Sequence, residues 1–438
     1  MYPQPALAMA APQDNCAPAI LSDRGRRVEP DSLPRLVRPN GLVFVPGSSG
    51  APSVFMTELL SKNDLTRDAR LLTTYVPGIN RLDLSSLHPT GQVTGLFMQP
   101  GLADAQRAGH FRTLPLSYGG FVRYLVDHVD IDLAVVQVSE PDEVGQCSLG
   151  PAVEFSQIAL SRSRRRLALV NRNTPRIQGA VSVPYSSFDF VCEVDSALPV
   201  YSVGSDACTD TIAAHIASLI DDGCALQIGL GKVPAALTRL VRDRRNLRLY
   251  SGMLSDGLFD LDDAGALDPD FAHTACVLVG SDPFYRRLSD FPSLRVLGCE
   301  TTHDPRTLVG LERFVTVNSA LEVDLFGQSN LEHANGSAIS GAGGAPDFAR
   351  AGRLSAGGCS IVALNATHGK GSRIVPYLSN HAVASLPRID VDYVITEFGI
   401  ARLTGASVHE RAEAIIGVAA PEYREELTDS WRAIAARL

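Results

Sequence analysis

The sequence has no cysteine pair with C-x-x-C spacing, although it contains eight cysteines. They are scattered along the chain, at positions 16, 147, 192, 208, 224, 276, 299 and 359. A chain of 438 residues does not need a disulfide framework to fold, and structural zinc sites use closely spaced ligands. We therefore expect reduced, mostly buried thiols, no metal site and a cytoplasmic location.

An excess of positive charge is also absent. Lys and Arg total 39 against 48 Asp and Glu, which gives a formal net charge of -9. Proteins that bind nucleic-acid backbones have the opposite balance, so we expect no nucleic-acid partner. An acidic chain can still bind an anionic small ligand through a few backbone amides.

Long apolar runs are missing too. No uninterrupted apolar stretch reaches the roughly 20 residues that span a bilayer, so we expect no membrane partner. The N-terminal MYPQPALAMAAPQDNCAPAILSD has no basic region and no continuous apolar core, and prolines interrupt it. These features do not fit a signal peptide, and we predict a disordered tail over residues 1–30.

Three common catalytic motifs do not occur. The sequence contains no G-x-S-x-G elbow, no H-E-x-x-H pair and no Walker A loop. Serine-hydrolase, zinc-hydrolase and P-loop chemistry therefore have no support. The ten histidines are scattered, and we expect them to be surface or hydrogen-bonded polar groups.

What the sequence does contain is an alternation of short apolar runs with helical stretches. The run Leu42–Val45 precedes a tight Pro-Gly loop and a helix that begins near Pro52, and LLTTYV, VTGLFM and IDLAVVQV repeat the order. Such alternation predicts βαβ units around parallel sheets. The fold class is therefore α/β, and the length favours two or three domains at about 150 residues each.

The alternation stops around residues 185–205, a segment with few helical features that includes Pro199. It restarts after Asp206 with a predicted helix, the apolar run CALQI and several further apolar runs. We place the inter-domain connection in this segment. The prediction is an N-terminal α/β domain over residues 31–200 and a C-terminal α/β domain over residues 201–438.

Two glycine-rich loops are built alike, because each precedes a proline that suits the first turn of a helix. Such loops let backbone amides approach an anion or a developing oxyanion, although each alone could be a simple turn. Two similar loops in one half of the chain favour a shared ligand. The first comprises Gly229, Leu230, Gly231, Lys232 and Val233, and the second comprises Gly341, Ala342, Gly343 and Gly344.

Three further segments carry polar groups near predicted strand ends. Ser251–Gly257 follows the run Leu247–Tyr250 and reads as a turn. Glu322 and Asp324 alternate in a predicted hairpin strand, where carboxylates are usually solvated or ion-paired. Glu397 ends the run Tyr393–Ile395, at the edge where open α/β sheets bind ligands, although a capping or ion-paired role is equally compatible with the pattern.

Taken in order, these segments resemble the acetyl-CoA hydrolase/transferase family of family I coenzyme A-transferases, which includes 4-hydroxybutyrate CoA-transferase. The resemblance runs from about Leu42 to near the C-terminus. It rests on VVQVSEPDEVGQCSLGPAVEFS, DDGCALQIGLGKVPAAL, VTVNSALEVDLFGQ, ISGAGGAPDFARAGRLSAGGCSIVAL, SRIVPYL and DYVITEFGIARLTGASVHERAEAII. The family's fold implies two similar α/β domains, largely parallel sheets and an active site at the domain interface.

The resemblance also implies the ligand and the site. Coenzyme A or acyl-CoA would be the substrate, and a small carboxylate or another acceptor would be the second reactant. Residues 229–233, with Gly341 and Ala342, would contact CoA, and Gly343 and Gly344 would line the oxyanion region. Asn318 and Glu397 match family positions near the reacting centre. A homo-oligomer, most simply a dimer, is expected by analogy.

One position departs from the family pattern. The family reads approximately H-[ST]-E-M-x-S-D-G, and its glutamate forms a glutamyl-CoA thioester. This chain reads Tyr250-Ser251-Gly252-Met253-Leu254-Ser255-Asp256-Gly257, which puts Gly252 at the glutamate position. Glycine has no nucleophile, so the covalent route is unexpected here.

Three functions remain open from the sequence. The chain could transfer CoA by an altered route, with Glu300 or Glu397 as a substitute carboxylate. It could be an acyl-CoA thioester hydrolase or acyltransferase, in which water or an acceptor attacks directly. It could also bind CoA without catalysis.

Overall fold

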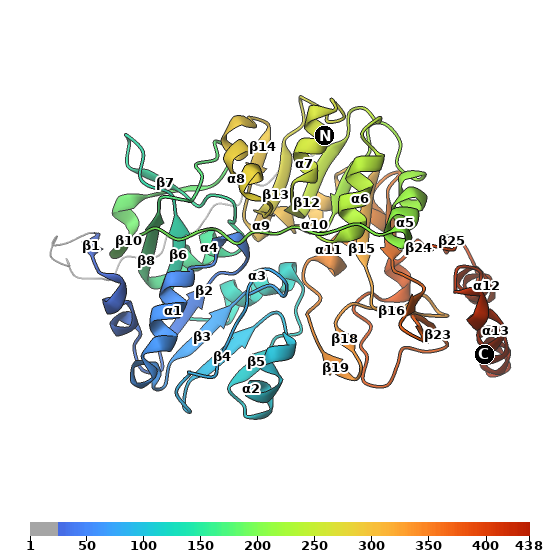
Figure 1. Ribbon diagram of the computed structural model, residues 1–438, viewed down its shortest axis with the longest axis horizontal. Helices are drawn as coiled ribbons and strands as arrows, with labels where there is room; N and C mark the ends of the chain where they lie inside the picture. The colour runs from blue at the N-terminus through green and yellow to red at the C-terminus, as the bar shows by residue number, and fades with distance from the viewer. Residues whose placement is uncertain (1–24) are drawn as a thin grey trace.

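The structure is a computed structural model that describes residues 25–438. Two eight-stranded sheets organise the chain, one formed before residue 200 and one after it. Figure 1 shows them side by side, the first in blue to green and the second mostly in yellow-green to red. This confirms the α/β prediction and the two largely parallel sheets.

All strand pairs of the first sheet are parallel. Its central strands are almost continuously apolar and buried, as strands covered on both faces must be. In order across the sheet, the strands are β1 (Arg26–Arg27), β10 (Phe190–Val194), β8 (Ser163–Asn171), β6 (Ile131–Val138), β2 (Leu42–Val45), β3 (Arg70–Thr73), β4 (Gln92–Gly95) and β5 (Phe111–Thr113).

The second sheet is parallel except for its last pair, β24 with β25. In order across the sheet, the strands are β14 (Leu294–Val296), β13 (His273–Leu278), β12 (Arg248–Leu254), β11 (Ala225–Ile228), β15 (Phe314–Ser319), β20 (Cys359–Ala363), β24 (Tyr393–Thr396) and β25 (Gly399–Arg402).

Short strands form smaller ribbons beside the two sheets. They are β7 (Gln146–Ser148) with β9 (Ser182–Pro184); β16 (Glu322–Asp324) between β17 (Ser329–Asn330) and β23 (Ile374–Val375); β18 (His333–Ala334) with β19 (Ser337–Ala338); and β21 (Thr367–His368) with β22 (Gly371–Ser372).

Helices begin where the sequence supplies caps or prolines. Ser117 and Asp206 each accept a backbone N–H at the start of a helix, and Pro346 lies in the first turn of α11. The α-helices are α1 (Ser53–Ser61), α2 (Ala103–Arg107), α3 (Tyr118–Asp127), α4 (Ser156–Arg162), α5 (Ala207–Ala217), α6 (Lys232–Leu240), α7 (Gly257–Asp263), α8 (Asp282–Arg287), α9 (Cys299–Thr302), α10 (Pro305–Val309), α11 (Ala345–Leu354), α12 (Val408–Gly417) and α13 (Arg424–Ala435).

Helices α3, α9, α10 and α11 lie in the middle of the molecule, between the two sheets (Figure 1). Helix α3 comes from the first half of the chain and contacts α9, while α10 contacts α11. Among residues 25–438, no helix combines the length and the apolar character needed to cross a bilayer.

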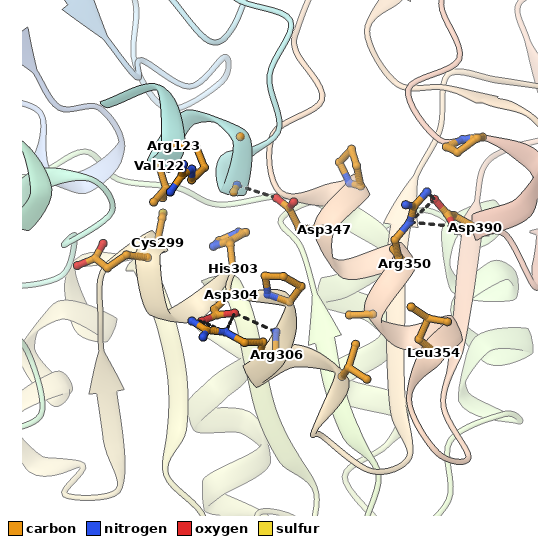
Figure 2. A pocket seen from close by; sticks show the side chains of 18 residues that line it. Val122, Arg123, Cys299, His303, Asp304, Arg306, Asp347, Arg350, Leu354 and Asp390 are labelled. Carbon is orange, nitrogen blue, oxygen red and sulfur yellow. Dashed lines mark hydrogen bonds and ion pairs between the residues drawn. The ribbon is translucent and has the colours of Figure 1, made fainter. Parts of the chain in front are cut away.

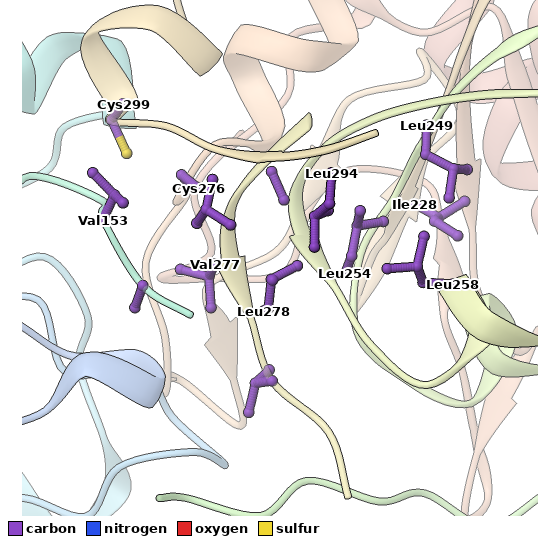
Figure 3. Packing of buried hydrophobic residues seen from close by; sticks show 14 of the residues in the cluster. Val153, Ile228, Leu249, Leu254, Leu258, Cys276, Val277, Leu278, Leu294 and Cys299 are labelled. Carbon is purple, nitrogen blue, oxygen red and sulfur yellow. The ribbon is translucent and has the colours of Figure 1, made fainter. Parts of the chain in front are cut away.

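A segment of the first half, residues 151–154, runs along the second sheet. The N–H of Val153 donates to the carbonyl of Cys276 at 3.0 Å, and the N–H of Cys299 donates to the carbonyl of Glu154 at 2.7 Å. Figure 3 shows Val153 beside the β13 residues Cys276 and Val277. One hydrophobic cluster contains buried residues of both halves, so the halves share a core.

Two local expectations were wrong. The tail predicted over residues 1–30 extends too far, because Arg26–Arg27 pair with β10; its first 24 residues lie outside the described part of the chain. Glu322 and Asp324 are buried, because β16 pairs on both sides.

The segment predicted to connect the domains, residues 185–205, contains β10 of the first sheet and the stretch that leads from it to α5. The connection there and the division into 31–200 and 201–438 stay proposals.

We predict that Glu154 makes stability depend on pH. Its buried carboxyl accepts hydrogen bonds from Ser48 and Thr74, and burial raises its pKa from 4.5 to about 7. The unfolded chain releases this proton near pH 4.5, whereas the folded chain retains it up to about pH 7. The stabilisation is therefore present in full below pH 4.5 and is lost as the pH rises through 7. The free energy of unfolding falls over this range by on the order of 3 kcal/mol.

Glu154→Gln should remove this part of the pH dependence. Urea denaturation between about pH 5 and pH 8 measures it, with Glu143→Gln at an exposed position as the matched control. If the free energy of unfolding changed with pH equally in wild type and in Glu154→Gln, the prediction would be contradicted.

Candidate active site

The neighbouring strands β12, β11 and β15 place three residues predicted from the sequence side by side at their carboxyl ends. These residues are Gly252, Gly229 and Asn318. Ile228 of β11 pairs with Val317 of β15, so the next residues, Gly229 and Asn318, lie side by side. On the other side of β11, the hydroxyl of Ser251 donates to the carbonyl of Ile228 at 2.6 Å, which brings Gly252 of β12 level with Gly229. The carboxyl ends of these parallel strands share one edge, where α/β sheets bind ligands.

There is open space at Gly229, because a Cβ atom there would meet no heavy atom within 4 Å. Asn318 beside it is 8% exposed, and its side-chain N–H group has no hydrogen-bond partner. A buried amide donor without a partner costs stability and marks a place where a ligand oxygen can bind.

The surroundings of Gly252 are aromatic. A Cβ atom at this position would lie 3.3 Å from Cε2 of Phe348 and 3.6 Å from Nε2 of His303. No carboxylate is among these nearest groups. A side chain longer than alanine at 252 must therefore displace one of the two rings or turn away from them.

His303 is the least expected residue of the site. It follows α9, is 2% exposed, and packs against the rings of Tyr118 and Phe348 with centroid distances of 5.0 and 4.7 Å. Its Nδ1 is 2.9 Å from the hydroxyl of Thr302, whereas its Nε2 has no partner. Burial lowers the pKa of His303 to about 3, so the ring is neutral. The expectation of surface or fully hydrogen-bonded histidines therefore holds for Nδ1 of His303 but not for its Nε2.

The second glycine loop closes the site against the first half of the chain. The N–H of Met98 donates to the carbonyl of Ser340 at 3.2 Å, and the N–H of Tyr118 donates to the carbonyl of Gly343 at 3.1 Å. A side chain at Gly341 would collide with the carbonyl oxygen of Leu96. Gly341 to Gly344 are therefore held between the two sheets, on the α3 side.

The ring of His303 leaves no room for a side chain at position 344. A Cβ atom at 344 would lie 2.9 Å from Cδ2 of that ring and closer still to Nε2. The loop therefore lies directly over the imidazole nitrogen that lacks a partner. Figure 2 shows His303 above Asp304 and near Asp347, which follows the loop. Asp347 accepts hydrogen bonds from the Ser117 hydroxyl and the Gly119 N–H.

The first glycine loop lines a cavity of about 250 Å³. Gly229, Leu230 and Gly231 form one side of it, and the turn from Met253 to Gly257 forms another. Gly231 has φ 131°, a value that favours glycine. Lys232 and Val233 belong to α6, and the Lys232 ammonium pairs with Asp206 at 2.9 Å.

A larger cavity, of about 770 Å³, lies between α3, α9, α10 and α11 (Figure 2). His303 and Glu300 both line it. The carboxylate of Glu300 has one oxygen without a partner, and burial raises its pKa. Arg306 and Arg350 of this cavity are paired with aspartates.

Glu397 lies away from these groups. It follows β24, which is separated from β15 by β20, and its carboxylate accepts the N–H of Ala366 at 2.8 Å. Its charge raises the pKa of the Cys208 thiol, after the larger effect of burial. The structure thus brings Gly252, Gly229, Asn318 and Gly344 together and leaves Glu397 two strands from Asn318.

Cys276, Cys299 and His303 are the one group of three possible metal ligands found among the described residues. Their ligand atoms lie within 4.8 Å of one another, and all three residues are buried. Cys276 already donates its S–H to the carbonyl of Gly252 at 3.0 Å, and burial raises the pKa of Cys299 well above its ordinary value. Metal binding needs thiolates, so these thiols are better suited to packing and hydrogen bonding.

Comparison with known proteins assigns the chain to a family. The profile of the acetyl-CoA hydrolase/transferase N-terminal domain matches residues 26–203, and that of the C-terminal domain matches residues 280–431. A 4-hydroxybutyrate coenzyme A transferase from Clostridium kluyveri is 32% identical over 385 residues, which cover 81% of this chain and 88% of that protein. The chain belongs to the acetyl-CoA hydrolase/transferase family. Its relatives include CoA-transferases and acetyl-CoA hydrolases, and the chain is an enzyme of this kind.

Solved structures agree with this assignment. RipA from Yersinia pestis is 27% identical with a TM-score of 0.86, over 94% of this chain and 98% of that one. A 4-hydroxybutyrate CoA-transferase from Porphyromonas gingivalis is 26% identical with a TM-score of 0.76, over 93% and 97% of the two chains. The two matched family domains leave residues 204–279 between them, and these include Gly252 and the first glycine loop.

We predict that Gly344→Ala destabilises the fold by about 1–3 kcal/mol, because the methyl group would overlap a ring that is enclosed by two other aromatic side chains. Gly101→Ala is the control, since a Cβ atom there meets nothing within 4 Å; its effect should stay within about 0.5 kcal/mol. Urea denaturation measures both. Equal stability of the two variants would show that the loop moves freely away from His303.

Proposed function

We propose that the protein moves CoA or an acyl group between an acyl-CoA and a small acceptor without a glutamyl-CoA intermediate. The observation that carries the proposal is Gly252, whose position has no nucleophile and is bordered by Phe348 and His303 instead of a carboxylate. Membership of the family supports acyl-CoA as the substrate.

The remaining parts of the site suit direct attack on a thioester. The space at Gly229 can hold the reacting carbonyl, and the amides of Gly343 and Gly344 can donate to the oxyanion. The unpartnered amide of Asn318 supplies a further donor. Oriented donors in a site that excludes water can be worth several kcal/mol to such a reaction. Water or a bound acceptor would then replace the enzyme's own carboxylate as the attacking group.

The first glycine loop supports a CoA site beside it. Gly229 to Gly231 line a cavity beside the reacting centre, and the N-terminus of α6 adds free N–H groups and a positive dipole. We further propose that the two halves of the chain form the active site between them, that the enzyme is a cytoplasmic dimer, and that no metal takes part.

Gly229→Asp should weaken CoA binding at least tenfold, about 1.4 kcal/mol, because its carboxylate would enter the space proposed for the ligand and repel anionic CoA. The open surroundings of Gly229 allow this change without a clash, and Gly101→Asp places the same charge at an equally open position elsewhere. Titration calorimetry with CoA measures the affinity. Equal affinity in both variants would refute the placement.

The proposed function is tested by thiol release and by the search for an adduct. Wild-type protein incubated with a panel of acyl-CoAs should release free thiol or exchange CoA. Because no carboxylate lies at 252, mass spectrometry should find no covalent CoA adduct, and borohydride should not inactivate the enzyme. The absence of thiol release and exchange with every acyl-CoA would leave only CoA binding. An adduct on Glu300 or Glu397 would restore a covalent route with a relocated nucleophile.

A further inference from the structure

We infer that His303 is the catalytic base of this enzyme and that the attacking group is a protic nucleophile, namely water, an alcohol or an amine. The inference rests on the proposed function and specifies the second reactant. A carboxylate acceptor attacks a thioester without losing a proton, so a base contributes nothing to that reaction. A base beside Gly252 is useful only when the nucleophile carries a proton.

The position of the ring is the first argument. Its Nε2 would lie 3.6 Å from a side chain at Gly252, and it is covered by Gly344 of the loop that supplies the proposed oxyanion donors. A base must reach the nucleophile while the oxyanion forms on the other side of the same carbonyl carbon. His303 lies between these two elements.

The tautomer is the second argument. The Thr302 hydroxyl is 3.3 Å from the carbonyl of Gly298 and 2.9 Å from Nδ1 of His303. A hydroxyl has one proton, and the carbonyl can only accept it. Thr302 therefore accepts a hydrogen bond from Nδ1–H, which leaves a free lone pair on Nε2. Thr302 is a positioning residue in this arrangement.

The state of the ring is the third argument. The rings of Tyr118 and Phe348 enclose the imidazole, and burial raises the pKa of the neighbouring Cys299 thiol well above its ordinary value. Burial lowers the pKa of His303, which keeps the ring neutral and its Nε2 able to accept a proton but also makes the free ring a weak base. The negative charge that develops on the thioester oxygen stabilises the imidazolium when it forms, because charges interact strongly at low dielectric.

Access to Nε2 requires the glycine loop to shift, since the loop covers it. Three of the four residues from Gly341 to Gly344 are glycines, which permit such a change of backbone conformation. Catalytic hydrogen bonds commonly reach their working geometry only when the substrate is bound.

The reaction balances with the residues present. The nucleophile's oxygen or nitrogen bonds to the thioester carbon while its proton passes to Nε2 of His303, and the carbonyl becomes an oxyanion. The oxyanion then collapses, the carbon–sulfur bond breaks, and the leaving thiolate takes the proton from Nε2–H. The products are CoA thiol and an acid, ester or amide, and the ring is neutral again.

The test compares three variants with wild type. His303→Asn shortens the ring to an amide, Thr302→Val removes the hydroxyl but keeps the shape, and His381→Asn changes an exposed histidine as the control. Acetyl-CoA and butyryl-CoA are the probes. Thiol release is measured with water and with a panel of small alcohols and amines, and CoA exchange is measured separately with isotope-labelled acetate.

His303→Asn should lower kcat for the protic nucleophiles by about 100-fold or more, with KM for the acyl-CoA unchanged and with any acetate exchange retained. Thr302→Val should also lower kcat without raising KM, and nitrogen-15 NMR of the imidazole should show that the Nδ1–H tautomer is no longer fixed. This variant decides the matter if His303→Asn does not fold. His381→Asn should behave as wild type.

Four results would overturn the inference. An unchanged rate in His303→Asn would show that His303 is not the base, and the proposed function would still stand. An equal loss of acetate exchange and of the protic reactions would make His303 a structural residue. One zinc or copper ion per chain, held by Cys276, Cys299 and His303, would make the imidazole a ligand. Wild-type protein that neither cleaves nor exchanges any thioester would refute the proposed function and the inference together.

Discussion

The interaction on which the site depends is the set of backbone hydrogen bonds that residues 151–154 make to β13 and α9. Val153 binds the carbonyl of Cys276, and the carbonyl of Glu154 receives the N–H of Cys299 at the start of α9. Since α9 leads directly into His303, the first half of the chain fixes where the imidazole lies. The buried hydrophobic cluster common to both halves stabilises this arrangement.

Two features of the site belong together. Gly252 lacks the nucleophile that the family pattern leads one to expect, and the buried His303 places an unpartnered nitrogen beside the same position. A buried polar atom without a partner costs stability, and a functional use of the nitrogen is one explanation of that cost. Chemistry that uses an external protic nucleophile accounts for both features at once.

Much of the fold could be predicted from local sequence, because short apolar runs such as Leu42–Val45 and Ala225–Ile228 favour strands. Proline placement likewise indicated the helices after both glycine loops. The environment of His303 could not be predicted, since its burial arises from Tyr118 and from Gly344 and Phe348, which are distant from it in the chain. The burial of Glu322 and Asp324 also depends on pairing with distant strands, which a local alternation of residues does not reveal.

The crowding around Gly252 has an evolutionary consequence. A long side chain at 252 and the imidazole at 303 compete for neighbouring space, and Gly344 is shaped to the imidazole. The effect of a mutation at one of these positions therefore depends on the residue at the others, which is epistasis. A single replacement at 252 would meet the rings before it could acquire a new role. A glutamate at 252 would thus require coordinated changes at more than one position.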